Sequence, residues 1–272
     1  MNTTEILWTS LENAFERYPN LKKIFPQTWP RHKKFGITFE KLAEFQKKRL
    51  LDDIEALNFP LLLYNAEFGS EKKVKEVFSS VLKKIDSFAL NMVSTPGGKS
   101  ILQPLWTDGW QDTRLWGVVS EIFYADLMVH QKFPILGFDR TITNSTETAD
   151  IETRFDGKKT WIDIEAHTLK PFDGTQEEFR NLLEHRAKKK MSDKFSNLPS
   201  TELGMVASIY RIKSEQNMDK FTEYKNVTHP VPGPAPHITA SIYWFSIGRY
   251  GEGEYFLALM DRTKDAIKLK SD

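Results

Sequence analysis

The sequence lacks cysteine, long apolar runs and an excess of either charge, and each absence excludes a class of protein. Without cysteine there are no disulfides and no thiolate metal sites, which fits a reducing compartment. The longest apolar runs, such as residues 59–64, are far shorter than the roughly 20 residues of a membrane span. The N-terminus shows no signal-peptide pattern. We therefore expect a soluble, cytoplasmic protein with no membrane partner.

The charge balance excludes a globally basic protein. Lys and Arg number 38 against 37 Asp and Glu, which gives a net charge of +1. No overall positive field therefore indicates a nucleic-acid partner, although a local basic surface stays open. A length of 272 residues and 40% hydrophobic content suit one large globular domain or two smaller ones.

The first hundred residues are predicted to be helical. Apolar residues recur at helical spacing in 4–15, 39–57 and 72–90. The lysines of 72–90 lie mostly off the apolar stripe, so a solvated face is the favoured interpretation and a phosphate-contacting surface the alternative. Residues 94–100 contain Gly-Lys-Ser, but Val93 occupies the first glycine position of a phosphate loop. We interpret them as a linker between a helical region, 1–100, and a domain, 101–272.

The most informative stretch runs from Ala149 to Lys170. Two runs of alternating apolar and polar residues flank Asp156-Gly157, which favours a two-residue hairpin turn. Counting outward from that turn puts Asp150 opposite Asp163. Like charges directly opposite destabilise a sheet, so the pair needs a compensating partner, and a bound cation is the simplest one.

Side chains alternate between the two faces of a strand, which sorts the second half of this hairpin. Ile162, Ile164 and Ala166 share a wholly apolar side that should face a core. The other side carries four residues of the alternating run: Trp161, Asp163, Glu165 and His167.

The elements around the hairpin follow in a definite order. A helix over 112–131, which contains Glu121, precedes strands over 134–143, around Asp150 and over 161–167. A capping-box pattern opens the next helix, over 175–195. A strand buried on both sides is expected over 203–210. Loop 226–237 and a terminal hairpin, formed by 238–247 and 255–260, end the chain.

This order, helix-strand-strand-strand-helix-strand, with acidic residues on the first helix and the second and third strands, resembles the PD-(D/E)XK nuclease superfamily. The resemblance covers about residues 112–210. It implies an α/β, restriction-endonuclease-like fold: a mixed central sheet flanked by helices, here with an N-terminal helical region. The family motif is an acidic residue on one strand, then an acidic residue, any residue and usually a lysine on the next. A glutamate often comes from the preceding helix.

The resemblance implies a metal-dependent site that binds Mg²⁺, or Mn²⁺, through carboxylate oxygens. Such a cation polarises the phosphate and lowers the pKa of an attacking water. The implied metal ligands are Asp150, Asp163 and Glu165, and the implied catalytic residues add Glu121 and His167.

Two registers compete because the motif lysine is missing. One uses Asp150, Glu165 and His167, with histidine in place of lysine. The other uses Asp150, Asp163 and Glu165, with glutamate there. Strand pairing favours the register with Asp163, because it puts Asp163 opposite Asp150. Residues 168–171, which follow the motif, favour the register with His167, towards which we lean. A simpler interpretation of His167 is a strand-end histidine that hydrogen-bonds a neighbour.

The expected function is a Mg²⁺-dependent endonuclease, a hydrolase that cleaves DNA phosphodiester bonds. The alternative is a catalytically inactive relative that serves as a nucleic-acid-binding or protein-interaction module. DNA is the expected partner, and a homodimer is left open. Four lysines of the helix over 175–195 either contact phosphates or form a solvated face: Lys188, Lys189, Lys190 and Lys194.

Overall fold

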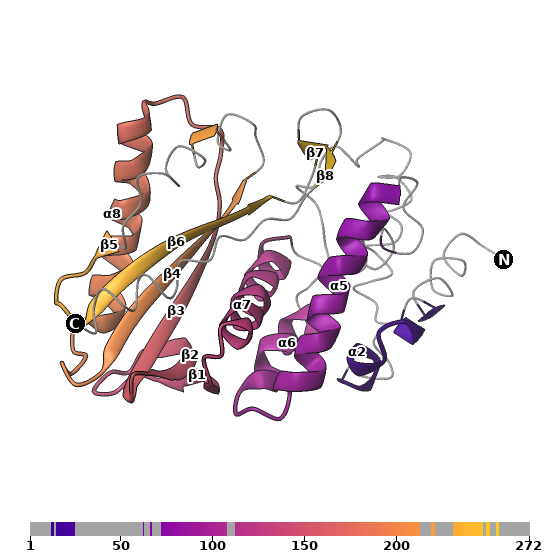
Figure 1. Ribbon diagram of the computed structural model, residues 1–272, viewed down its shortest axis with the longest axis horizontal. Coiled ribbons are helices and arrows are strands. Elements are labelled where there is room, and N and C mark those ends of the chain that lie inside the picture. Colours follow the sequence, from indigo (N-terminus) through magenta and orange to yellow (C-terminus); the bar gives the residue numbers. More distant parts are fainter. Residues whose placement is uncertain are drawn as a thin grey trace.

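The computed structural model is an α/β protein in which one sheet lies between helical layers (Figure 1). It describes residues 12–13, 15–24, 62, 66, 72–107, 112–212, 219–220, 231–246, 249–250 and 254–255. The helices expected over 4–15 and 39–57 lie largely or wholly outside these residues. The helix expected over 72–90 is confirmed as α5 (Lys72–Met92).

A six-stranded mixed sheet in the order β1-β2-β3-β4-β6-β5 forms the centre of the fold. Its first three strands are antiparallel neighbours, whereas β3, β4 and β6 run parallel. Their bounds are β1 (Ile135–Thr141), β2 (Thr148–Phe155), β3 (Lys158–Thr168), β4 (Leu203–Ile212), β5 (Val231–Pro232) and β6 (Ile238–Ser246). The predicted α/β fold class is confirmed: a mixed central sheet is flanked by helices.

The hairpin between β2 and β3 turns where the sequence predicts. Phe155 pairs with Lys158, and Asp156 and Gly157 have φ values of 46° and 77°. Two successive left-handed residues are the signature of a type I′ turn, whose twist matches that of the strands. The turn thereby fixes the register that brings Asp150 next to Asp163.

Helix α8 (Gln176–Phe195) covers one face of the sheet (Figure 1). Thr175 caps its first turn through the predicted capping box, accepting a hydrogen bond from the Glu178 backbone N–H. Its buried residues are spaced four apart and pack against Trp161 and other side chains of the sheet. These helix residues are Phe179, Leu183, Ala187, Met191 and Phe195.

The other face of the sheet is covered by α7 (Asp112–His130), and α5 and α6 (Gly98–Thr107) pack beyond it (Figure 1). One cluster of buried side chains joins these helices, α2 (Pro19–Ile24) and the sheet residues Ile151 and Ile162. The apolar side of β3 faces this cluster, as predicted for Ile162 and Ile164, whereas Ala166 is exposed.

One expectation about connections needs correction. Residues 94–100 are not a linker: a turn leads directly into α6, and Phe138 N–H bonds the Pro96 carbonyl, tying the turn to β1. The strand β6 pairs in parallel with β4 and, over its first residues, antiparallel with β5. A small hairpin of β7 (Arg249–Tyr250) and β8 (Glu254–Tyr255) lies where the turn of the terminal hairpin was expected. The rest of the expected second strand, 256–260, lies outside the described residues.

Candidate active site

The pairing between β2 and β3 ends at Ile151 and Ile162, and beyond this point a carboxylate replaces the backbone carbonyl as hydrogen-bond acceptor. The backbone N–H of Ile164 donates to Oδ2 of Asp150 instead of to a strand carbonyl. The side chain of Asp150 therefore occupies the opening between the two strands. An unpaired buried backbone N–H is costly, so this contact also stabilises the opening.

Four acidic side chains from different elements influence one another electrostatically near this opening. Burial, and then the charges of Asp150, Asp139 and Asp163, raise the pKa of Glu121 on α7 well above its ordinary value. Burial and the neighbouring charge of Asp163 raise the pKa of Asp150 to about 7. Mutual repulsion of this kind marks sites that are built to hold a cation or to share a proton. We call these four residues the acidic cluster.

Asp139 is the member of the acidic cluster that the sequence did not reveal. It lies within β1 with φ at 50°, a left-handed conformation that an L-residue seldom adopts in a strand. Burial raises the pKa of its carboxyl group. The irregular backbone also lets Arg140 lie across Gly137 and reach Glu152, with Nε and Oε2 3.6 Å apart. Such local strain cannot be read from a residue pattern and is concentrated at functional sites in proteins generally.

Two lysines of α8 contact the carboxylates of β3 on the face of the strand that is turned towards α8. Nζ of Lys190 lies 2.6 Å from Oε1 of Glu165 and 3.4 Å from Oδ2 of Asp163. Nζ of Lys194 lies 3.1 Å from Oδ1 of Asp163 and 3.3 Å from Oε2 of Glu147. Asp163, only 3% exposed, is thus shared between the acidic cluster and the two lysines.

Glu165 has an environment opposite to that of Asp150. Burial raises the pKa of Glu165, but hydrogen bonds to His167 and Lys190, with the Lys190 charge, outweigh it and lower the pKa to about 2. Nε2 of His167 lies 3.2 Å from Oε2 of Glu165, and its ring stacks on Tyr210 at 4.9 Å. The four residues predicted to share one face of β3 do so, and His167 is also the hydrogen-bonding neighbour that the simpler interpretation expected.

The other two predicted lysines lie on the exposed side of α8. Lys188 and Lys189 are exposed, and Nζ of Lys188 lies 3.4 Å from Oε2 of Glu184. Helical spacing contains the signal that separates the pairs: Lys190 and Lys194 each directly precede a residue of the buried stripe, at positions 191 and 195. Positions 188 and 189 turn away from the sheet.

The acidic cluster fits a hard divalent cation in donor type and charge. Its oxygens are the ligands that Mg²⁺ and Mn²⁺ prefer, and Oδ2 of Asp163 is buried without a hydrogen bond although Lys190 lies 3.4 Å away. As they stand in the described residues, no three acidic or histidine side chains form a ready metal cage.

Comparisons with known proteins identify no family for this chain. No protein-family model matches it, and no curated protein sequence matches it. A search of solved structures finds the SfsA protein of Pyrococcus furiosus, in a complex with Ca²⁺, at 10% identity and a TM-score of 0.25. The match covers 54% of this chain and 63% of SfsA. In the described part of the chain, no helix combines the length and apolar character needed to cross a bilayer.

Proposed function

We propose that this protein is a metal-dependent phosphodiesterase that hydrolyses DNA at the opening between β2 and β3. The observation that carries the proposal is the crowding of carboxylates from three strands and one helix, with the pKa of Asp150 raised to about 7. Like charges that are partly buried together are destabilising unless something positive joins them. A strongly perturbed carboxylate cluster is also the usual mark of a catalytic centre.

Asp150 and Asp163 would hold the cation, with Glu121 approaching from α7. When bound, Mg²⁺ or Mn²⁺ polarises a phosphate and activates a water. Asp150 is oriented by the Ile164 N–H, and Asp163 by Lys194, so each keeps an oxygen directed at a fixed place. Glu165, paired with Lys190, belongs to the site as a fully ionised carboxylate and an alternative ligand.

Lys190 is the best candidate for the amine that the strand motif lacks. Its ammonium lies against both carboxylates of the Asp163-x-Glu165 segment, although it comes from α8 and not from β3. Burial lowers the pKa of Lys190, but the hydrogen bond to Glu165 and the Asp163 charge raise it overall, so the side chain stays protonated. A fixed cation there offsets the charge that develops on a phosphate during cleavage.

DNA would approach along the exposed side of α8. Lys188 and Lys189 leave that side of the helix as exposed cations that can contact phosphates without reading bases. Binding of this kind carries no sequence specificity of its own.

The contacts of Lys190 and Lys194 favour a second candidate, an inactive nuclease-like module. Two lysines already neutralise Asp163 and Glu165, and in such a module they would take over the role that a cation has in an enzyme. The domain would then bind nucleic acid or protein through its surface, and substitution of the acidic cluster would leave binding intact.

A cleavage assay with a parallel binding measurement separates the two candidates. Supercoiled, linear and single-stranded DNA are incubated with Mn²⁺ or Mg²⁺, using the natural protein, Asp150→Asn and the control Asp193→Asn, which changes an exposed aspartate of α8. Thermal melting with and without Mn²⁺ reports cation binding independently of cleavage. Metal-dependent cleavage by all but Asp150→Asn supports the enzyme. No cleavage and no Mn²⁺ stabilisation would leave only the inactive module.

A further inference from the structure

Helix α5 has two faces of opposite character, at a distance from the acidic cluster. One stripe of side chains is buried in the core shared with α7, including Phe78, Val81, Leu82 and Ile85. The opposite stripe repeats polar residues at helical spacing, at positions 72, 75, 76, 79, 80 and 83. Because α7 lies between α5 and the sheet, this polar face is a surface of its own (Figure 1).

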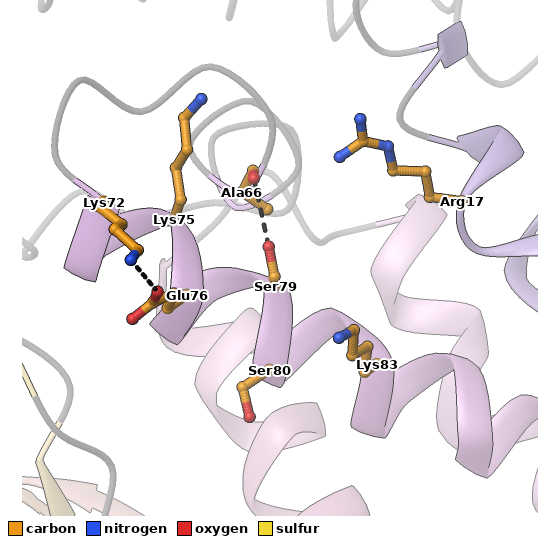
Figure 2. Close-up of a pocket in the computed structure, with 8 residues that line it drawn as sticks. All are labelled: Arg17, Ala66, Lys72, Lys75, Glu76, Ser79, Ser80 and Lys83. Atoms are coloured by element: carbon orange, nitrogen blue, oxygen red, sulfur yellow. Dashed lines mark hydrogen bonds and ion pairs between the residues drawn. The ribbon is translucent and has the colours of Figure 1, made fainter.

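The polar face of α5 borders a pocket of about 670 Å³, which we call the basic pocket. Arg17 approaches from the other side, so that its side chain and those of Lys75 and Lys83 border the space around Ser79 and Ser80 (Figure 2). The charged residues of its described lining are Arg17, Lys72, Lys75, Lys83 and Glu76. Among these described residues, four cations stand against one carboxylate.

The ion pairs of α5 leave part of this charge unpaired. Nζ of Lys72 lies 3.9 Å from Oε1 of Glu76, which is the only carboxylate among the described lining residues. Lys84, next in sequence, points elsewhere and pairs with Asp126 of α7. Within the described part of the chain, neither Lys75 nor Lys83 forms an ion pair. Lys75 and Lys83 nevertheless line the same pocket, together with Arg17 (Figure 2).

The lining selects phosphate groups over bases. Ser79 already donates its one hydroxyl hydrogen to the Ala66 carbonyl at 3.3 Å, so Ser80 carries the hydroxyl of the described lining that a phosphate could use. The described lining contains no aromatic ring on which a base could stack. Cations and hydroxyls without a stacking platform are the groups that proteins use against a phosphate backbone.

The spacing of the cations favours a strand over a single phosphate. Lys75 and Lys83 are eight residues apart, which is about 12 Å along a helix axis. Successive phosphates of one DNA strand advance about 3.4 Å along the duplex axis, so the two lysines span three to four of them. A lone phosphate would engage both lysines only if both side chains bent towards a point midway between them, whereas a strand offers a phosphate to each.

We propose that the basic pocket binds the phosphate backbone of a nucleic acid, as a second contact remote from the acidic cluster. The choice of nucleic acid as the ligand rests on the proposed function, whereas the choice of phosphate rests on the lining alone. The short polyphosphate anions that share this chemistry are separated from DNA by the experiment below.

The test measures binding of a fluorescent DNA duplex in EDTA, where no metal-dependent cleavage occurs, over a series of salt concentrations. The variant Lys75→Gln/Lys83→Gln is compared with Lys99→Gln/Lys158→Gln, which removes the same charge at exposed lysines of α6 and the β2–β3 hairpin. We expect about a 10-fold loss of affinity for the pocket variant, and a salt slope reduced by about 1.8, since each phosphate contact contributes roughly 0.9. The control should lose less than about twofold, and both variants should melt like the natural protein.

Each other outcome overturns part of the proposal. Equal affinity and slope for the two double variants would remove the basic pocket as a DNA contact. Binding of tripolyphosphate through Lys75 and Lys83, without binding of duplex or single-stranded DNA, would assign the pocket to a small anion instead. Cleavage in Mn²⁺ is measured separately: loss of DNA binding in the pocket variant of a protein that never cleaves would refute the proposed function and leave the pocket standing.

Discussion

Asp150 and Glu165 are carboxylates on neighbouring strands whose environments shift their pKa values in opposite directions. Burial beside Asp163 raises the pKa of Asp150 to about 7. Burial alone would raise the pKa of Glu165, but His167 and Lys190 lower it to about 2. The difference comes from α8: its lysines reach Glu165 and Asp163, whereas Asp150 faces other acidic side chains.

This contrast indicates which of the two carboxylates lacks a positively charged partner. A pair of titratable groups with pKa values pushed apart usually divides the chemical roles between them. Glu165 is satisfied and fixed, so it serves best as a permanent charge. Asp150 has one backbone hydrogen bond and several repelling neighbours, so it gains most from a divalent cation. Four predictions test this division, in order of decreasing expected effect.

The largest effect is expected on cleavage when Asp150 loses its charge. Asp150→Asn keeps the acceptor for the Ile164 N–H but removes a charged metal ligand. Since even outer-shell groups of metal sites contribute 10- to 100-fold, we expect a rate loss of at least about 100-fold. Steady-state cleavage of plasmid DNA measures it, with Asp193→Asn as the unchanged control. Cleavage by Asp150→Asn at the natural rate would place the chemistry elsewhere.

The second prediction removes the lysine that lowers the pKa of Glu165. Lys190→Met leaves Glu165 and Asp163 without their shared ammonium, so we expect unfolding to become easier by about 2 kcal/mol, between the values for exposed and buried pairs. The exposed neighbour Lys189→Met is the matched control. Chemical denaturation measures both. Adding Glu165→Gln to Lys190→Met should restore part of the loss, and strict additivity of the two changes would deny the coupling.

The third prediction sharpens the comparison through pH. The pKa of Asp150 is raised in the folded protein, from 3.8 to about 7, so its ionisation opposes folding and stability declines as pH rises from 4 to 7. The pKa of Glu165 is lowered, from 4.5 to about 2, so its stabilisation is present above pH 4.5 and lost as pH falls towards 2.

Each variant should therefore flatten a different limb of the stability profile. Asp150→Asn reduces the decline between pH 4 and 7, to which Glu121 and Asp139 also contribute, and Glu165→Gln reduces the loss between pH 4.5 and 2, each by about 1 to 2 kcal/mol. Denaturation midpoints collected across this range, without metal, measure both limbs. Identical profiles for the two variants would show that the two carboxylates share one environment.

Local rules allowed the fold to be predicted further than the site. The Asp156-Gly157 turn determined the β2–β3 register, because a two-residue loop with left-handed residues has few geometries. The assignment of β3 side chains to the two faces of the sheet followed from the alternation of side chains along a strand. Neither rule could identify Asp139, whose role depends on one unusual φ angle within an otherwise ordinary strand.

The contact between Lys190 of α8 and Glu165 of β3 was not predicted, for a different reason. A run of three lysines gives no indication of which member turns inward until its register against the buried stripe of the helix is considered. Position 190 precedes Met191 of that stripe, and this places its ammonium beside Glu165. The contact joins residues 25 apart in sequence, and no local pattern encodes it.

The smallest effect is expected for His167, and it separates the two registers of the motif. His167 bonds Oε2 of Glu165, whereas Lys190 bonds Oε1, so His167→Ala leaves the lysine pair intact. If Lys190 supplies the amine and Asp163 a ligand, His167→Ala should reduce the rate by less than about 10-fold, whereas Asp163→Asn should match Asp150→Asn. Rates at saturating Mn²⁺, with melting curves for each variant, measure this. The Glu165-x-His167 register requires the opposite ranking: a loss for His167→Ala as large as that for Asp150→Asn, with Asp163→Asn close to the natural rate.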